Sequence, residues 1–332
     1  MRHITTLEMH TEGEPLRIIT SGLDPIPGKT IVEKRAYAKT HLDGLRRFLM
    51  FEPRGHADMY GAILTEPVTP GADVGVLFLH NEGWSTMCGH GIIALTKALA
   101  DGLVAPPTGA ITPKKTEWRI DAPAGLITAR RLDGSRSAFE NVPSFALALD
   151  EVVDVPSLGP ITYDIGFGGA FYAYVDVAQV GLDLTPENNR ALIETGMAIK
   201  RAVMSSRVIP HPFEAELSFL YGTIFGGPPH NPRNQARNVC IFAEGEVDRS
   251  PTGTGVSGRL ALEHAHGRLR AGEDFTIESI LGTTFSGKIL RETTFGGHAA
   301  IVPEVSGQAW VTGRNEFWLE DDDPLGKGFI LR

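Results

Sequence analysis

Short apolar stretches, separated by glycine, proline and polar residues, make up most of the chain. Some alternate apolar and polar side chains and others are continuously apolar, as expected of half-buried and buried β-strands. The 38 glycines and 22 prolines supply the turns between them. The clearest predicted strands are 17–20, 75–79, 171–175, 238–243 and 309–312.

Two helices are predicted by a capping residue followed by apolar residues at helical spacing. Thr40 is expected to be the N-cap of a helix over 41–50, with Asp43 in the first turn, where a carboxylate favours the positive end of the helix dipole. Thr185, followed by a proline, predicts the start of a second helix that runs to about residue 204.

Two further helices begin at motifs that look like edited copies of one another. Residues 88–92 (CGHGI) and 252–256 (TGTGV) are separated by about half the length of the chain, and each opens a run that is apolar on most sides. Such runs predict buried helices, which end at Gly102 and Gly267. A buried helix wrapped by short strands in each half predicts an α+β protein with its site in the cleft between two similar halves.

Composition favours a globular protein with a small-molecule partner. Of the 332 residues, 42% are hydrophobic and 21% are charged, which suits two domains that each have a core. The formal net charge of −9 and the absence of a Lys/Arg block argue against nucleic acid and an anionic membrane surface as partners. Apolar runs are far shorter than a membrane span, and residues 1–8 lack the apolar segment of a secretory signal.

The positions of the cysteines and histidines argue against disulfides and metal sites. Cys88 and Cys240 lie far apart without CxxC spacing, which argues against a disulfide framework and a structural zinc site. The 11 histidines form no HExxH or comparable pattern, so the sequence predicts no metal. We therefore expect a reducing, cytoplasmic environment.

The paired motifs predict an anion-binding site at the start of each helix. Glycines let a ligand approach the backbone closely, and the first amides of a helix are unpaired beside the positive end of its dipole. Two such sites suit a carboxylate, which an enzyme holds before it removes the proton on the neighbouring carbon. At a helix start a thiol pKa can fall from about 8.5 into roughly the 3.5–7.5 range, so Cys88 is a candidate general base.

Each candidate residue also has a purely structural interpretation. The structural alternative for Cys88 is a small buried apolar residue, and that for His90 is a side chain that satisfies backbone groups at the helix start. Asp248 either pairs with a substrate ammonium or caps the turn that follows it. For Cys240, in an alternating strand, the structural interpretation is preferred. Phe167 and Phe225 are interpreted either as packing on a substrate ring or as core.

Several motifs along the chain form a recognisable set. They are 9–15 (MHTEGEP), 54–60 (RGHADMY), 87–91 (MCGHG), 168–173 (GGAFYA), 248–255 (DRSPTGTG), 278–282 (ESILG) and 323–329 (DPLGKGF). Together, and almost from end to end of the chain, they resemble the proline racemase family, which includes 4-hydroxyproline epimerases and trans-3-hydroxy-L-proline dehydratases.

The resemblance implies two α/β halves of the diaminopimelate epimerase type, no cofactor and a homodimer. The expected first half covers 1–155 with a return segment at 318–332, and the second covers 156–317; the turn-rich passage near 150–160 favours the same boundary. Cys88 matches the first catalytic cysteine and Asp248 a residue at the ring nitrogen of the substrate. The matching substrate-binding positions are Gly89, His90, Gly253 and Thr254.

Thr252 departs from the racemase pattern, because racemases and epimerases have their second catalytic cysteine at this position. Inversion needs a base on one face of the carbon and an acid on the other, and a threonine hydroxyl is too weak an acid for that cycle. Loss of water needs only one base at Cα. Cys88 with Thr252 therefore resembles the dehydratase branch, which converts trans-3-hydroxy-L-proline to Δ1-pyrroline-2-carboxylate.

Three questions stay open at the level of the sequence. Thr252 either donates a hydrogen bond near the other ring face or only fills the space of the missing thiol. His90 and Cys88 are both candidates to protonate the departing hydroxyl. The alternatives to a dehydratase are a proline racemase or 4-hydroxyproline epimerase and, from a different class, a non-catalytic imino-acid-binding protein.

Overall fold

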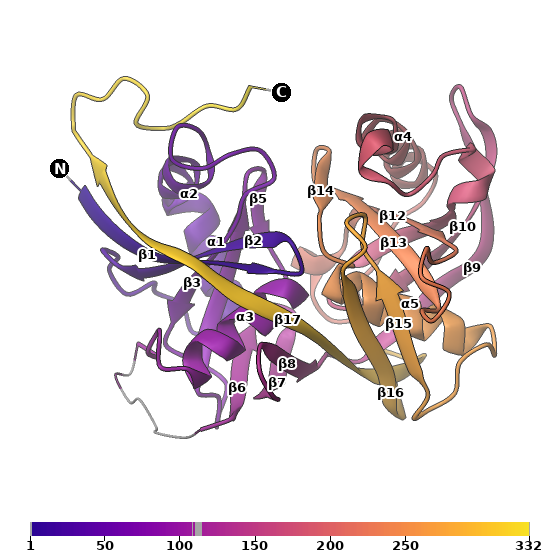
Figure 1. Ribbon diagram of the computed structural model, residues 1–332, viewed down its shortest axis with the longest axis horizontal. Coiled ribbons are helices and arrows are strands. Elements are labelled where there is room, and N and C mark those ends of the chain that lie inside the picture. Colours follow the sequence, from indigo (N-terminus) through magenta and orange to yellow (C-terminus); the bar gives the residue numbers. More distant parts are fainter. Residues whose placement is uncertain (1, 108, 110–114, 332) are drawn as a thin grey trace. The chain divides into compact units, whose positions relative to one another are not determined.

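The computed structural model describes residues 2–107, 109 and 115–331, and the chain divides into two compact units (Figure 1). Unit 1 comprises Met1–Phe139 and Gln308–Arg332, and unit 2 comprises Glu140–Gly307. Both boundaries fall earlier in the chain than the expected 155/156 and 317/318. The turn-rich passage near residue 155 joins two antiparallel strands of unit 2, so it is a hairpin turn and does not link the units.

Unit 1 contains three helices among its described residues. They are α1 (Ile31–His41), α2 (Asp43–Met50) and α3 (Gly89–Ala100). Its strands are β1 (Arg2–Thr11), β2 (Glu14–Ser21), β3 (Tyr60–Thr65), β4 (Val74–His80), β5 (Gly83–Ser85), β6 (Glu117–Ala122), β7 (Gly125–Arg131), β8 (Arg136–Glu140) and the last part of β17 (His298–Leu319).

Unit 2 contains two α-helices among its described residues, α4 (Asn189–Ser206) and α5 (Gly253–Ala265), and three short 3₁₀ helices. The 3₁₀ helices are Val177–Val180, Pro186–Asn188 and Ala215–Leu217. Its strands are β9 (Ser144–Val155), β10 (Gly159–Phe167), β11 (Phe171–Asp176), β12 (Leu220–Gly227), β13 (Ala236–Phe242), β14 (Glu246–Asp248), β15 (Asp274–Glu278), β16 (Thr284–Phe295) and the first part of β17.

One series of strand pairings occurs in both units. In unit 1, β1 pairs antiparallel with β2, β2 parallel with β3, β3 antiparallel with β4, β4 antiparallel with β5 and parallel with β6, and β6 antiparallel with β7. Unit 2 repeats every step from β10 to β16. In each unit the motif helix follows the short third strand of the antiparallel run. The two halves are therefore similar α/β structures, as predicted.

The prediction of one helix over 41–50 was wrong in its start, and it missed α1 altogether. Thr40 lies inside α1 and donates a hydrogen bond to the Ala36 carbonyl, whereas the α1 N-cap is Thr30. The buried face of α1 includes Lys34 and Arg35, which donate to backbone carbonyls of unit 1. Because two cations occupy its inner face, α1 lacks the apolar periodicity that identifies a helix in a sequence.

The motif helices pack closely against their sheets at a glycine. A Cβ added to Gly91 would lie 2.5 Å from a ring carbon of Phe78 on β4, and one added to Gly255 would lie 2.5 Å from the Ile224 side chain on β12. These distances are shorter than any allowed contact. The third residue of each helix is therefore a glycine for the same steric reason in both halves.

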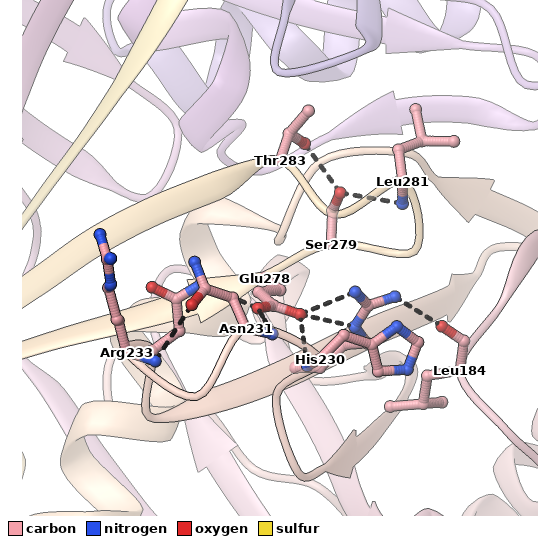
Figure 2. Close-up of polar contacts among 10 residues, drawn as sticks. Leu184, His230, Asn231, Arg233, Glu278, Ser279, Leu281 and Thr283 are labelled. Atoms are coloured by element: carbon pink, nitrogen blue, oxygen red, sulfur yellow. Dashed lines mark hydrogen bonds and ion pairs between the residues drawn. The ribbon is translucent and has the colours of Figure 1, made fainter.

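A buried carboxylate in unit 2 organises the loop between β12 and β13 (Figure 2). Glu278 accepts hydrogen bonds from the backbone amides of His230 and Asn231, from Asn234 Nδ2 and from the Arg237 guanidinium, at 2.7–2.9 Å. Burial raises the pKa of Glu278, but these hydrogen bonds outweigh it and hold the pKa at about 2. The loop is thus tied to the sheet by a charged, fully hydrogen-bonded group.

Unit 1 has a carboxylate that binds loop amides at the equivalent position. Asp121 and Glu278 occupy the same place in the ladders β4–β6 and β13–β15. Asp121 accepts hydrogen bonds from the backbone amides of Val68 and Thr69 and from the Thr69 hydroxyl, at 2.9–3.0 Å. The likeness of the halves therefore extends from topology to individual polar contacts.

We expect Glu278→Gln to lower the free energy of unfolding by about 3–5 kcal/mol, because it leaves the buried Arg237 cation without its counter-ion. Urea denaturation measures the change. The wild-type stabilisation should be present above pH 4.5 and be lost as the pH falls through about 2.

The control is Glu194→Gln, which removes an exposed pair with Arg190 and should cost about 0.5 kcal/mol or less. Equal effects of the two substitutions would contradict this account.

Candidate active site

The start of α3 presents the thiol of Cys88. Cys88 is the N-cap in extended conformation, and its Sγ accepts a hydrogen bond from the Gly91 amide at 3.2 Å. The side chain is 4% exposed. The sulfur thus takes the place that a serine or aspartate oxygen usually holds at a helix start, where the dipole favours negative charge. This placement favours the thiolate, which is the form that acts as a base.

His90 lies beside the thiol. Its Nδ1 and Nε2 are 3.3 and 3.5 Å from Cys88 Sγ, and the residue is 3% exposed. The Thr11 hydroxyl donates to the His90 carbonyl at 2.8 Å. The Tyr60 ring meets the His90 ring edge to face at 4.8 Å and stacks on His80 at 5.3 Å. Aromatic packing and a backbone hydrogen bond from β1 therefore hold the imidazole next to the sulfur.

The start of α5 differs from that of α3 in its backbone and in its side chain. Thr252 is the N-cap with φ 67° and ψ 99°, a left-handed conformation that is unusual for a β-branched residue. Its side chain does not cap the helix. Thr252 Oγ1 is buried and makes no hydrogen bond of ordinary geometry with the described residues. The hydroxyl lies instead near the Asp248 carboxyl, whose pKa it lowers.

The first turn of α5 is held at three successive residues by side chains of unit 2. The Tyr172 hydroxyl is 2.8 Å from Thr254 Oγ1, and the Tyr174 hydroxyl donates to the Gly255 carbonyl at 2.7 Å. The Ser257 hydroxyl donates to the Gly253 carbonyl at 3.0 Å. Because both tyrosines come from β11, this strand positions the amides at the start of the helix.

Asp248 ends β14, four residues before Thr252, and is 6% exposed. Its Oδ1 accepts a hydrogen bond from the Ser250 amide at 2.8 Å, so it caps the turn as one interpretation of the sequence predicted. Burial raises its pKa from 3.8 to about 6, although the Ser250 hydrogen bonds and the Thr252 hydroxyl lower it. Above pH 6 the site therefore contains a buried carboxylate suited to a cationic ligand.

The raised pKa of Asp248 makes stability depend on pH. The folded protein binds this proton more tightly than the unfolded chain, so the stabilisation is fully present below pH 3.8 and is lost as the pH rises through about 6. Asp248→Asn should therefore exceed the wild type in unfolding free energy by about 3 kcal/mol at pH 8, and the difference should shrink toward pH 4. Urea denaturation at both pH values tests this, and a difference independent of pH would contradict it.

One group of described residues has the geometry to hold a metal ion. Potential ligand atoms of Asp150, Asp164 and His266 lie within 4.8 Å of one another. The Asp164 carboxylate already accepts hydrogen bonds from His266 Nε2 at 2.8 Å and from the Asp150 amide at 2.7 Å. His266 is the C-cap of α5, at the opposite end of the helix from Thr252. The group is thus remote from the residues that the sequence singles out.

The two phenylalanines considered for substrate packing are core residues. Phe167 and Phe225 are both 0% exposed. Phe167 packs among other rings of unit 2, 4.7 Å from Phe171 between centroids. Phe225 faces α4, where a Cβ added to Gly196 would lie 3.2 Å from its ring.

Sequence reasoning missed the residues that position the two helix starts. Tyr60, Thr11, Tyr172 and Tyr174 come from strands distant in sequence from the helices that they contact. For Tyr60, Thr11 and Tyr172 the only signal was membership of the motifs 9–15, 54–60 and 168–173, to which the residues alone assign no chemistry; Tyr174 lies in the predicted strand 171–175. No described helix combines the length and the apolar character required to cross a membrane.

Within unit 1, a thiol at a helix N-cap beside an imidazole is an arrangement suited to removing a proton next to a carboxylate. A family model described as Proline racemase matches residues 6–330, and the chain belongs to that family.

Relatives and a solved structure cover nearly the whole chain. A trans-3-hydroxy-L-proline dehydratase from Colwellia psychrerythraea is 48% identical over 99% of this chain and 93% of its own length. A 3-hydroxyproline 2-epimerase from Burkholderia multivorans is also 48% identical, over 100% of this chain and 99% of its own. The structure of a hydroxyproline epimerase from Agrobacterium vitis, with bound trans-4-hydroxy-L-proline, has a TM-score of 0.91 at 32% identity and covers 100% of this chain and 95% of its own.

Proposed function

We propose that the protein dehydrates trans-3-hydroxy-L-proline to Δ1-pyrroline-2-carboxylate. Cys88 removes the Cα proton, the 3-hydroxyl leaves as water, and the resulting enamine tautomerises to the cyclic imine. The proposal includes cytoplasmic action as a homodimer without a cofactor and a fold of the diaminopimelate epimerase type, which the repeated strand pairing supports.

The observation that carries the proposal is the difference between the two helix starts. The sulfur of Cys88 accepts an amide hydrogen bond beside an imidazole, so this helix start supports a base. The equivalent Thr252 has a hydroxyl that does not cap its helix and is too weak an acid to take part in proton transfer at Cα. One base is sufficient for loss of water, whereas inversion at Cα requires a second acid–base group.

The remaining residues bind the substrate in this proposal. The amides of Gly89, His90, Gly253 and Thr254 hold the carboxylate, because the first amides of a helix have no partner within it. Asp248 binds the ring ammonium in its anionic form. The KM should therefore rise as the pH falls below about 6, as the carboxyl takes up a proton. The Thr252 hydroxyl does not cap α5, so in this proposal it can donate a hydrogen bond to the substrate or to Asp248.

A racemase or epimerase acting on proline or a hydroxyproline is the second candidate. The observation in its favour is the 3-hydroxyproline 2-epimerase, which matches this chain as well as the dehydratase does. Overall identity therefore does not separate the two activities, and in this proposal the residue at position 252 is the feature that does.

Direct assay tests the proposal. Reduced wild-type protein is incubated with trans-3-hydroxy-L-proline, and Δ1-pyrroline-2-carboxylate is detected by its reaction with o-aminobenzaldehyde. We expect product with this substrate and none with proline, which has no 3-hydroxyl to lose. If the wild type and Cys88→Ser were equally inert yet both bound pyrrole-2-carboxylate, the protein would instead be a non-catalytic imino-acid-binding protein.

A further inference from the structure

We propose that His90 is the acid that protonates the departing 3-hydroxyl, which makes it a second catalytic residue on the same ring face as Cys88. This assignment rests on the proposed dehydration and decides between the two acids that the sequence leaves open. It also assigns His90 a chemical step beyond the substrate binding that its motif implies.

The geometry at the start of α3 places an acid and a base side by side. Cys88 Sγ already accepts the Gly91 amide hydrogen at 3.2 Å, and both ring nitrogens of His90 lie within 3.5 Å of it. The Gly91 amide donates to the sulfur, and an imidazole at this distance can share a proton with it, so the pair can adopt the thiolate–imidazolium form that the proposal requires. Both side chains are less than 5% exposed, so water has little access to replace either of them.

The substrate requires its acid and its base on one face. In trans-3-hydroxy-L-proline the carboxylate and the 3-hydroxyl lie on opposite faces, so the Cα hydrogen and the hydroxyl lie on the same face of adjacent carbons. An adjacent thiolate and imidazolium match this pair of groups. Thr252 is not needed for either proton transfer.

The imidazole is held so that it faces the sulfur. The Thr11 hydroxyl fixes the His90 carbonyl, and the Tyr60 ring packs edge to face against the imidazole. In unit 2 the equivalent position is Thr254, whose hydroxyl is engaged by Tyr172. An imidazole is therefore placed beside the N-cap side chain at only one of the two described helix starts.

The step balances without another reactant. The thiolate takes the Cα proton, the electron pair of the C–H bond forms the C2–C3 double bond, and the C3–O bond breaks. The imidazolium gives its proton to the departing oxygen, which leaves as water. Transfer of the proton from the Cys88 thiol to His90 then restores the thiolate–imidazolium pair, so each turnover releases one enamine and one water.

A change of leaving group tests this role. Fluoride needs far less help from an acid than hydroxide, so trans-3-fluoro-L-proline requires the base but not the acid. We expect His90→Gln to lower kcat for trans-3-hydroxy-L-proline by roughly 10²–10³-fold. Fluoride release from the fluoro substrate, measured with a fluoride electrode at saturation, should fall by a factor about tenfold smaller than the fall on the hydroxy substrate, because only the loss of thiolate stabilisation acts on both substrates.

The controls separate this proposal from the function on which it rests. His41→Gln, on the exposed surface of α1, should leave both rates unchanged. An equal fall on both substrates, or no fall on the hydroxy substrate, would overturn the role of His90. A wild type inactive on the hydroxy substrate would instead overturn the proposed function. Thermal melting checks the fold of His90→Gln, and His90→Asn replaces it in the same comparison if it does not fold.

Discussion

We expect Cys88→Ser to lower kcat/KM for trans-3-hydroxy-L-proline by roughly 10³-fold. Serine keeps a side-chain acceptor for the Gly91 amide, so the start of α3 should remain intact. Its hydroxyl is a much weaker acid than a thiol and has no anionic form at neutral pH that can take the Cα proton. The o-aminobenzaldehyde assay under reducing conditions measures the loss.

The matched control for this substitution is Cys240→Ser. Cys240 is the other cysteine of the chain and is 1% exposed on β13. Its substitution should change stability but leave kcat within about threefold of the wild type, since it supplies no group to the acid–base step. If Cys88→Ser retained more than a tenth of wild-type activity, Cys88 would not be the base.

The second large effect is a gain of activity in Thr252→Cys. A thiol at this position restores the second acid–base group of the family's epimerases, so the deprotonated substrate can be reprotonated on its other face. We expect cis-3-hydroxy-D-proline, absent with the wild type, to become a major product, and dehydration to fall. Cysteine lacks the branch at Cβ that is strained at φ 67°, so the substitution should be tolerated by the fold.

Chiral chromatography of the reaction mixture detects the new product. Thr252→Ser is the control, because it keeps a hydroxyl but adds no thiol, and it should form no D-isomer. Failure of Thr252→Cys to form any cis-3-hydroxy-D-proline would mean that the identity of residue 252 does not decide between elimination and inversion.

Local patterns in the sequence were sufficient to predict the motif helices. The runs after Cys88 and Thr252 are apolar on most sides because α3 and α5 are buried, and glycines mark their ends. Helix α1 could not be predicted in this way, since Lys34 and Arg35 occupy its inner face and bind carbonyls that only the fold brings near. The unit boundaries were also missed, because a hairpin turn and a linker have the same composition.

In the candidate site, too, some residues could be predicted from local sequence and others could not. Cys88, His90 and Asp248 were candidates from residue type and from the family resemblance, and the structure buries all three. The contacts of Tyr172 and Tyr174 with the first turn of α5 span about 80 residues and have no local signature. Sequence therefore predicts the reactive groups, whereas the residues that position them emerge only from tertiary contacts.

The most direct test of a one-base elimination is the fate of trans-3-hydroxy-L-proline in D2O, followed by proton NMR. The wild type should form Δ1-pyrroline-2-carboxylate with deuterium at C3, because the enamine takes a proton from solvent as it tautomerises. No cis-3-hydroxy-D-proline should appear. Accumulation of cis-3-hydroxy-D-proline with deuterium at Cα, in place of the pyrroline, would contradict the account, because it requires a second acid–base group on the opposite face.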